Sequence, residues 1–208
     1  MRESRVAASG KKDRQCPIVP VCGIFCAVNG ESRHPGAPLP GEIGGYKPVR
    51  EIGRGAHGTM YLADGPEGRV ALKVCRRPAD SAQEDAWERE KRGWSIFTRI
   101  PAHPGLVRVF ATGETADPAA FWVAMEAADP EEGGSAEEPD GYRPLTLASV
   151  AEAEVALPLG RTLEIGERLA GALEHLQAHH LLHRDVKPGN VLFAGGKPVI
   201  ADAGLEIP

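Results

Sequence analysis

The stretch 181–193, Leu-Leu-His-Arg-Asp-Val-Lys-Pro-Gly-Asn-Val-Leu-Phe, constrains this chain more than any other part of it. It sets four strong polar groups, His183, Asp185, Lys187 and Asn190, between two apolar flanks. Charges are seldom fully buried unless they are paired, so packing alone would not select this composition. The Asp185 carboxylate can accept a hydroxyl proton, the Lys187 ammonium can hold a phosphate, and the Asn190 amide oxygen can bind a hard cation such as Mg²⁺.

The spacing of these residues resembles the catalytic loop of protein kinases, H-R-D-x-K-x-x-N, with all five fixed letters present. An accidental match in a polar surface loop is the alternative, and further motifs elsewhere in the chain argue against it. The resemblance implies an α+β, two-lobed, protein-kinase-like fold, with a small antiparallel β lobe that carries one helix and an incomplete helical lobe. It also implies ATP and Mg²⁺ as cofactors and a protein substrate with Ser or Thr. Lys187 follows the pattern of serine/threonine kinases, and bacterial members are the nearest general likeness.

A glycine-rich segment between two expected strands, 46–52 and 59–63, gives the second motif. Dinucleotide-binding folds also use G-x-G-x-x-G, but they need a helix after the glycines and an acidic residue about twenty positions on. Here the following residues are β-prone, and the twentieth position after Gly53 is Lys73. The segment resembles the glycine-rich loop of kinases, which implies that the ATP-binding residues here are Ile52, Gly53, Gly55, Gly58 and Met60.

The short apolar strand 70–74 holds one ammonium, Lys73, and is similar to the kinase V-A-I-K motif. A snorkelling surface Lys is the alternative. The resemblance implies that Ala71 contacts the nucleotide and that Lys73 binds the α- and β-phosphates.

Residues 81–100 are predicted to form a helix, with a capping box from Ser81 and Glu84. Its tryptophans and Phe97 fall on one face, and Glu90 lies inside this apolar stripe. A carboxylate that points inward needs a cationic partner, so we expect an ion pair with Lys73. A half-exposed Glu90 at the edge of the stripe is the alternative.

Strands are expected at 106–112 and 119–125, and the second resembles the kinase strand that leads into the hinge between the lobes. By that resemblance Met125 borders the adenine pocket, and backbone groups of Glu126 to Ala128 bond adenine. The acidic, glycine-rich residues 129–140 are predicted to be a solvated loop, followed by a short helix within 144–155.

A helix is predicted for residues 162–179, because Ile165, Leu169, Leu173 and Leu176 repeat at helical spacing. A hairpin should follow the catalytic loop and end at Asp202, in a position similar to the metal-binding D-F-G of kinases. Ala203 replaces the Phe of that motif. The resemblance implies that Asn190 and Asp202 hold Mg²⁺.

The expected organisation is a flexible tail over 1–45, a kinase N-lobe over 46–127, and a hinge, insert and partial C-lobe over 128–208. The net charge of −5 does not indicate a nucleic-acid-binding surface. The longest apolar run, Cys16 to Val28, is 13 residues long and too short to span a membrane. We expect a cytoplasmic protein whose four cysteines are free thiols.

Only Leu-Glu-Ile-Pro follows Gly204, so the kinase resemblance lacks an activation segment and the remaining helices of the large lobe. The first hypothesis is a serine/threonine protein kinase, incomplete at its C-terminus. The second is a truncated, catalytically inactive ATP-binding or interaction module. We expect weak or absent phosphate transfer by the 208-residue chain, even if it binds Mg·ATP, and apolar surface on the helix around Leu169 and Leu173.

Overall fold

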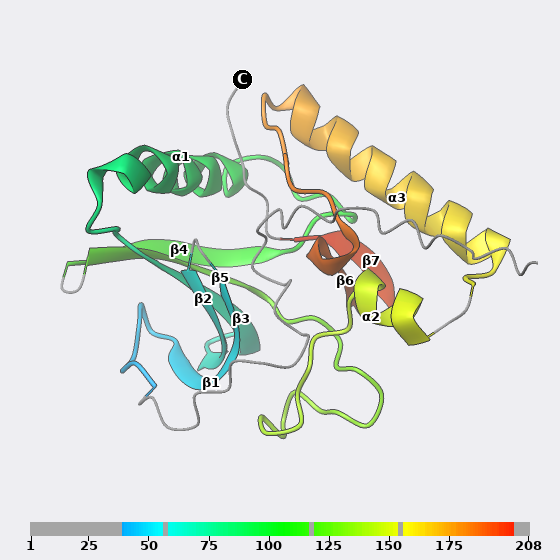
Figure 1. Ribbon diagram of the computed structural model, residues 1–208, viewed down its shortest axis with the longest axis horizontal. Helices are drawn as coiled ribbons and strands as arrows, with labels where there is room; N and C mark the ends of the chain where they lie inside the picture. The colour runs from blue at the N-terminus through cyan, green and yellow to red at the C-terminus, as the bar shows by residue number, and fades with distance from the viewer. Residues whose placement is uncertain (1–38, 56–57, 117–118, 154–155, 202–208) are drawn as a thin grey trace, which may run out of the picture.

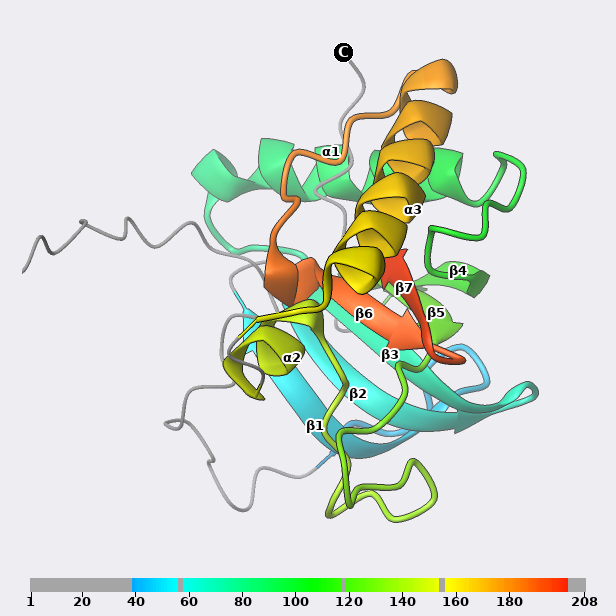
Figure 2. The same ribbon diagram turned by 90° about the vertical axis from the view of Figure 1, so that its right-hand side faces the viewer.

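The computed structural model describes residues 39–55, 58–116, 119–153 and 156–201 of the chain. An antiparallel five-stranded sheet carries helix α1 on one side, and a second group of elements contains two further helices and a short hairpin (Figures 1 and 2). The sheet has the order β1-β2-β3-β5-β4. Its elements are β1 (Lys47–Gly55), β2 (Gly58–Gly65), β3 (Gly68–Arg76), α1 (Ser81–Phe97), β4 (Val109–Ala116) and β5 (Ala119–Glu126). The second group holds α2 (Leu147–Ala153), α3 (Leu159–Ala178), the 3-10 turn η1 (Pro188–Asn190), β6 (Val191–Ala194) and β7 (Lys197–Ile200).

The two faces of the sheet are buried in two different hydrophobic clusters, because side chains alternate along each strand. Met60, Lys73 and Val123 lie opposite one another in the register of β2, β3 and β5 and share one face. The apolar residues of that face pack with Trp94 of α1. The other face packs around Trp122, which contacts Tyr46 at a ring-centroid distance of 5.6 Å and belongs to the second cluster.

Helix α1 is capped one residue earlier than the capping box predicts. The N-cap is Asp80, whose side chain accepts a hydrogen bond from Ala82 N at 3.0 Å. The prediction of Ser81 as the cap is therefore wrong, and Glu84 instead pairs with Arg77 at 2.5 Å. An aspartate accepts the orphan N–H groups of a first helical turn as well as a serine does, so the preceding residue takes the role.

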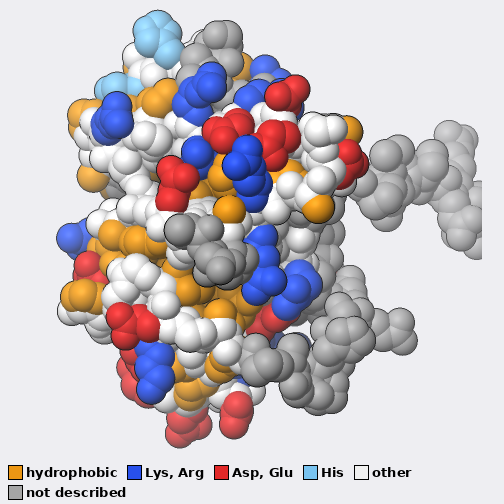
Figure 3. Space-filling model, turned by 90° about the vertical axis from the view of Figure 1, so that its left-hand side faces the viewer, with side chains coloured by type: hydrophobic (Ala, Val, Ile, Leu, Met, Phe, Trp, Pro, Cys, Tyr) orange, Lys and Arg blue, Asp and Glu red, His pale blue; other side chains and the backbone are white. Residues whose placement is uncertain are grey.

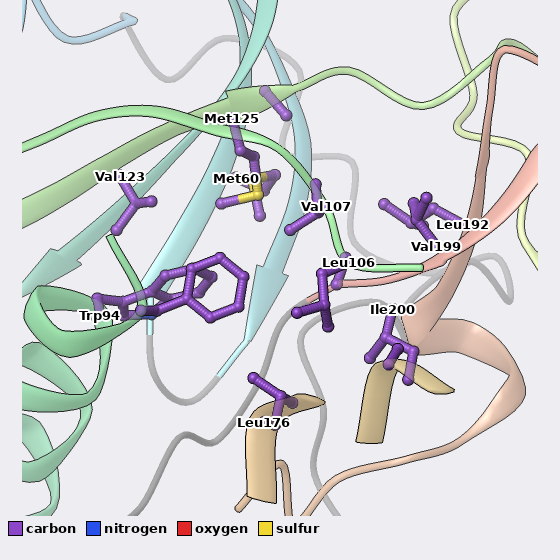
Figure 4. Close-up of a cluster of buried hydrophobic side chains, with 14 of the residues drawn as sticks. Met60, Trp94, Leu106, Val107, Val123, Met125, Leu176, Leu192, Val199 and Ile200 are labelled. Carbon is purple, nitrogen blue, oxygen red and sulfur yellow. The ribbon is translucent and has the colours of Figure 1, made fainter. Parts of the chain in front are cut away.

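The strand predicted at 106–112 is displaced, because β4 begins at Val109. Leu106 instead forms an isolated parallel bridge with Ile200, with hydrogen bonds from Val107 N to Ile200 O at 2.9 Å and from Ile200 N to Gly105 O at 2.8 Å. Backbone bonds thus join the segment before β4 to β7. Figure 4 shows the side chains at this junction, where Leu106 and Val107 lie between Trp94 on one side and Leu192 and Val199 on the other, and Ile200 lies below Leu192 and Val199.

Helix α3 begins at Leu159, three residues before the predicted start, and packs Ile165 and Leu176 inward. The helix does present apolar surface, as predicted, but not at Leu169 and Leu173, which are half-buried against the main cluster. The exposed leucines lie nearer the start of the helix, where Leu159 is 73% exposed and Leu163 is 56% exposed.

The acidic segment after β5 is anchored to the protein rather than free in solvent. Leu145 N bonds Asp129 O, and the Asp129 carboxylate accepts the N–H groups of Gly195 and Gly196 in the β6–β7 turn at 2.9 and 2.7 Å. The Tyr142 hydroxyl donates to Ala128 O at 3.0 Å. The prediction of a solvated loop holds for the exposed glutamates but not for these anchors.

The predicted tail over 1–45 falls largely outside the described residues, as do Cys16, Cys22 and Cys26. Within 39–45, Ile43 and Tyr46 exchange two backbone hydrogen bonds, at 2.8 and 3.0 Å. Gly44 lies against the Trp122 ring, where an added Cβ would stand only 2.1 Å from a ring carbon. Ordered structure therefore begins before the predicted start at Tyr46. Cys75 is buried and forms no disulfide within the described residues.

Candidate active site

A buried ion pair joins β3 to α1. Lys73 Nζ lies 2.7 Å from Glu90 Oε1, and the two residues are 1% and 9% exposed. The pair that the apolar stripe predicts is therefore present, and the half-exposed alternative is wrong. A desolvated charge needs such a partner, because an unpaired buried ion costs several kcal/mol. The same Glu90 oxygen lies 3.9 Å from the Cys75 sulfur.

The three glycines of the predicted phosphate loop lie in the hairpin of β1 and β2. Gly53 faces Met60 across the ladder, and Gly55 faces Gly58. At Gly58 the φ angle is +155°, and an added Cβ would stand 2.6 Å from Val74 O. A side chain would therefore collide with the backbone of β3, which explains glycine at this position. The hairpin tip, Ala56 and His57, lies outside the described residues.

The apolar residues assigned to the nucleotide share one buried cluster. Met60, Ala71, Met125 and Ala128 belong to it, and Ile52 packs against it half-buried. Ala71 and Met125 lie directly opposite in the β3–β5 register. These residues come from β1, β2, β3, β5 and the segment after β5, so the sheet brings them together as the sequence predicts.

The polar residues of stretch 181–193 form a compact network. The Asn190 amide Nδ2 donates to Asp185 O and to Asp185 Oδ2, each at 2.8 Å, and Lys187 Nζ lies 3.0 Å from the same carboxylate oxygen. Asp185 N in turn bonds His183 O at 2.8 Å, and Arg184 adopts a φ of +57°. This left-handed backbone turns the chain sharply and holds the Asp185 carboxylate beside Lys187 and Asn190.

Asn190 supplies an oxygen suited to a hard cation. The residue is fully buried, and its Oδ1 has no hydrogen-bond partner among the residues that the structure describes. A buried carbonyl-type oxygen without a partner is costly, and it is the kind of ligand that Mg²⁺ takes. The donor set therefore fits Mg²⁺ at this position. Asp202, the second predicted ligand, lies outside the described residues, and within the described ranges no group of three or more His, Cys, Asp or Glu residues could hold a metal ion.

Tyr142, in the segment between β5 and α2, has a raised pKa. Burial raises the pKa of Tyr142 well above its usual value of 10.0, and the nearby Asp129 carboxylate raises it further. A neutral Tyr142 can keep its hydrogen bond to Ala128 O, and so it fixes the backbone beside the predicted adenine pocket.

Three residues that support the site, Trp94, Asp129 and Tyr142, could not be identified as such from the sequence. Trp94 was predicted as core only, yet Lys73 Nζ lies 5.6 Å from its ring centroid. Asp129 and Tyr142 were placed in, or beside, a solvated loop. An aromatic residue on the buried stripe of α1 is equally expected of plain core, and the two anchors act through distant backbone groups, so none of the three leaves a local pattern.

Comparisons with known proteins bear on the family of this chain. The protein kinase domain family matches residues 46–206. The chain is 33% identical over 172 residues to the serine/threonine-protein kinase PknK of Mycobacterium tuberculosis, covering 80% of this chain and 14% of that protein. It is 32% identical over 168 residues to PknI of the same organism, covering 77% of this chain and 26% of PknI.

Solved structures give the same result. The crystal structure of the M. tuberculosis PknI kinase domain superposes with a TM-score of 0.61 at 31% identity, covering 82% of this chain and 62% of that one. No helix within the described ranges combines the length and apolar character needed to cross a bilayer. With its α+β fold, its motifs and these matches taken together, the chain belongs to the protein kinase family.

Proposed function

We propose that this chain is a serine/threonine protein kinase that transfers the γ-phosphate of ATP to Ser and Thr hydroxyls of proteins. The observation that carries the proposal is the buried Lys73–Glu90 pair in the same chain as the linked side chains of Asp185, Lys187 and Asn190. Phosphoryl transfer needs little covalent chemistry from the protein, so catalysis depends on position and on stabilised charge.

In this proposal the residues divide into three sets, which bind the α- and β-phosphates, act at the transferred phosphate, and hold Mg²⁺. Lys73, fixed by Glu90, binds the α- and β-phosphates beneath the backbone of Gly53, Gly55 and Gly58. Asp185 orients the acceptor hydroxyl and takes its proton, and Lys187 balances charge on the γ-phosphate. Asn190 and Asp202 are the proposed Mg²⁺ ligands, and the ion would neutralise phosphate charge when bound.

Hydrogen bonds at the end of β5 and just after it limit which backbone atoms can bind adenine. Glu126 N already donates to Arg108 O at 2.8 Å, and Ala128 O already accepts from Tyr142. These two groups are therefore not available to the base, and we assign adenine to the remaining backbone groups of residues 126–128. Ile52, Met60, Ala71 and Met125 would enclose the ring on its apolar sides.

The surface and the composition support a protein rather than a nucleic acid as the second substrate. The chain carries a net charge of −5. On the face in Figure 3, Lys and Arg side chains are interspersed with Asp and Glu around a central group of hydrophobic side chains. A basic stripe is the expected footprint of nucleic-acid binding, and mixed charge does not supply one. A cytoplasmic location follows from the use of ATP and is part of the proposal, as is the division into lobes at 127/128.

The rival function is an ATP-binding or interaction module without transfer activity. The chain spans only 14% of PknK and 26% of PknI, so the activity of those whole proteins does not by itself mean that this chain transfers phosphate. A binding measurement and a transfer measurement separate the two functions.

The test uses the 208-residue chain with Mg·ATP titrated by calorimetry, followed by transfer of labelled phosphate to a Ser/Thr-rich protein such as casein. We expect saturable binding and a weak transfer signal, which Asp185→Asn lowers by about 10²–10⁴-fold while binding is kept. Equal transfer by both proteins would remove Asp185 from catalysis. Binding with no transfer by either protein would favour the rival module, and absence of binding would contradict both functions.

A further inference from the structure

The Lys73 ammonium lies over an aromatic ring as well as beside a carboxylate. Its Nζ is 5.6 Å from the centroid of the Trp94 ring, one turn along α1 from Glu90. An ammonium over the face of an aromatic ring is attracted by the ring's quadrupole, and indole gives the strongest attraction of the aromatic side chains. Lys73 and Trp94 are each only 1% exposed, and the absence of water strengthens a cation–π contact.

The surroundings of Trp94 do not otherwise explain an indole. Figure 4 shows its ring among Val123, Met60 and Leu106, all of them apolar. The indole Nε1 is buried without a hydrogen-bond partner among the residues that the structure describes. Tryptophan is normally placed where its N–H meets an acceptor, and an aliphatic residue or Phe would fill an apolar site without that cost. The face of the ring toward Lys73 is the interaction that an aliphatic residue could not supply.

We propose that Trp94 is a positioning residue for Lys73, holding the ammonium by a cation–π contact so that α1 fixes this lysine at two points, Glu90 and Trp94. The inference rests on the proposed function, in which Lys73 binds ATP phosphates. A lysine stem is flexible, and one ion pair restrains its end at a single point. A second contact from the same helix makes the position of the ammonium depend on the position of α1.

A double-mutant cycle in thermal unfolding tests the contact without any nucleotide. The cycle uses Trp94→Leu, Lys73→Met and the double variant. We expect the midpoint loss caused by Trp94→Leu to be smaller in the Lys73→Met background by about 2–4 °C. Additive losses, within about 1 °C, would contradict the cation–π contact and leave Trp94 as ordinary core.

Trp87→Leu provides the matched control for this cycle. Trp87 lies two turns earlier on the same buried stripe of α1, but the cations over its ring are Lys91, at 4.8 Å, and Arg77, at 5.8 Å. We expect the losses of Trp87→Leu and Lys73→Met to add. Coupling of the same size for Trp87 would mean that any large loss from this stripe couples to Lys73, which would overturn the specific role of Trp94.

The dissociation constant for Mg·ATP tests whether Trp94 positions Lys73. This measurement needs no Lys73→Met variant, so it remains decisive if that variant does not fold. Trp94→Phe keeps an aromatic face, whereas Trp94→Leu does not. We expect the dissociation constant to change less than about 3-fold for Phe and to rise about 10-fold for Leu. Equal values for Phe and Leu would contradict the proposal. A coupled unfolding cycle in a protein that binds no nucleotide would instead defeat the proposed function and leave the Lys73–Trp94 contact standing.

Discussion

At the scale of single residues, the ion pair between Lys73 and Glu90 is the most consequential contact in the site. Both groups are out of water, so their mutual attraction offsets a desolvation cost that neither could meet alone. The pair also links β3 to α1, and therefore one contact determines both local stability and the geometry of the proposed phosphate site.

Replacing Lys73 by Met should leave Glu90 buried without its cation. We expect the free energy of unfolding, measured by urea denaturation, to fall by about 3–5 kcal/mol. Lys91→Met is the control. Lys91 lies on the same helix as Glu90 and pairs with Glu114 of β4 at 3.3 Å, but the Lys91 side chain is 27% exposed. That change should cost about 1 kcal/mol or less, and equal losses from the two variants would contradict the buried character of the Lys73 pair.

Tyr142 gives a prediction for alkaline pH. Its raised pKa means that above pH 10 the unfolded chain loses this phenol proton while the folded protein keeps it. Stability is therefore fully present below the unfolded pKa and falls as the pH rises toward the folded one. The unfolding free energy should decline above pH 10 by up to about 1.4 kcal/mol more per pH unit in the wild type than in Tyr142→Phe. Parallel pH profiles for the two proteins would contradict burial of the neutral phenol.

Residue types at fixed spacing made much of the site predictable. Lys73, Asp185 and Asn190 stand at fixed positions of short motifs, and Glu90 follows from one inward position in an apolar stripe. The contact of Trp94 with Lys73 was not predictable in the same way, because an aromatic residue on that stripe is equally expected of plain core. Its role depends on which strand faces the helix, and that is a property of the folded protein.

At the scale of elements, the start of α1 determines where Glu90 lies on the helix. Asp80, rather than Ser81, caps this helix, so a substitution at Asp80 should affect stability more. We expect Asp80→Ala to lower the free energy of unfolding by about 1 kcal/mol, since it removes the acceptor for Ala82 N. Ser81→Ala should change it by less than about 0.5 kcal/mol, and a larger loss from Ser81→Ala than from Asp80→Ala would restore the capping box.

The elements themselves follow from periodicity, whereas their ends and partners follow from tertiary contacts. The apolar run near Leu106 has the composition of a strand, but its backbone pairs with Ile200 of β7 instead of extending β4. Similarly, α3 starts at Leu159 although its inward-facing pattern becomes clear only at Ile165. Local sequence carries no information on these distant partners, so the register and boundaries were missed.

At the scale of the whole molecule, the two groups of elements meet through continuous core. Cluster residues come from the sheet, from α1, from α3 and from the β6–β7 hairpin, and the backbone bonds of Ile200 with Val107 and Gly105 join them. We propose that this junction lets Lys73, Asp185 and Asn190 bind one nucleotide together.

The most direct test is paramagnetic broadening of backbone amide signals by Mn²⁺ with a non-hydrolysable ATP analogue. Mn²⁺ accepts the oxygen ligands that Mg²⁺ takes, and its unpaired electrons broaden nearby resonances. If one nucleotide binds to both regions, two sets of amide signals should broaden together, with one shared dissociation constant. The first set comes from the glycine hairpin, including Gly53 and Gly55, and the second comes from Asp185 and Asn190. Broadening of only one set, or two different dissociation constants, would contradict a single nucleotide site.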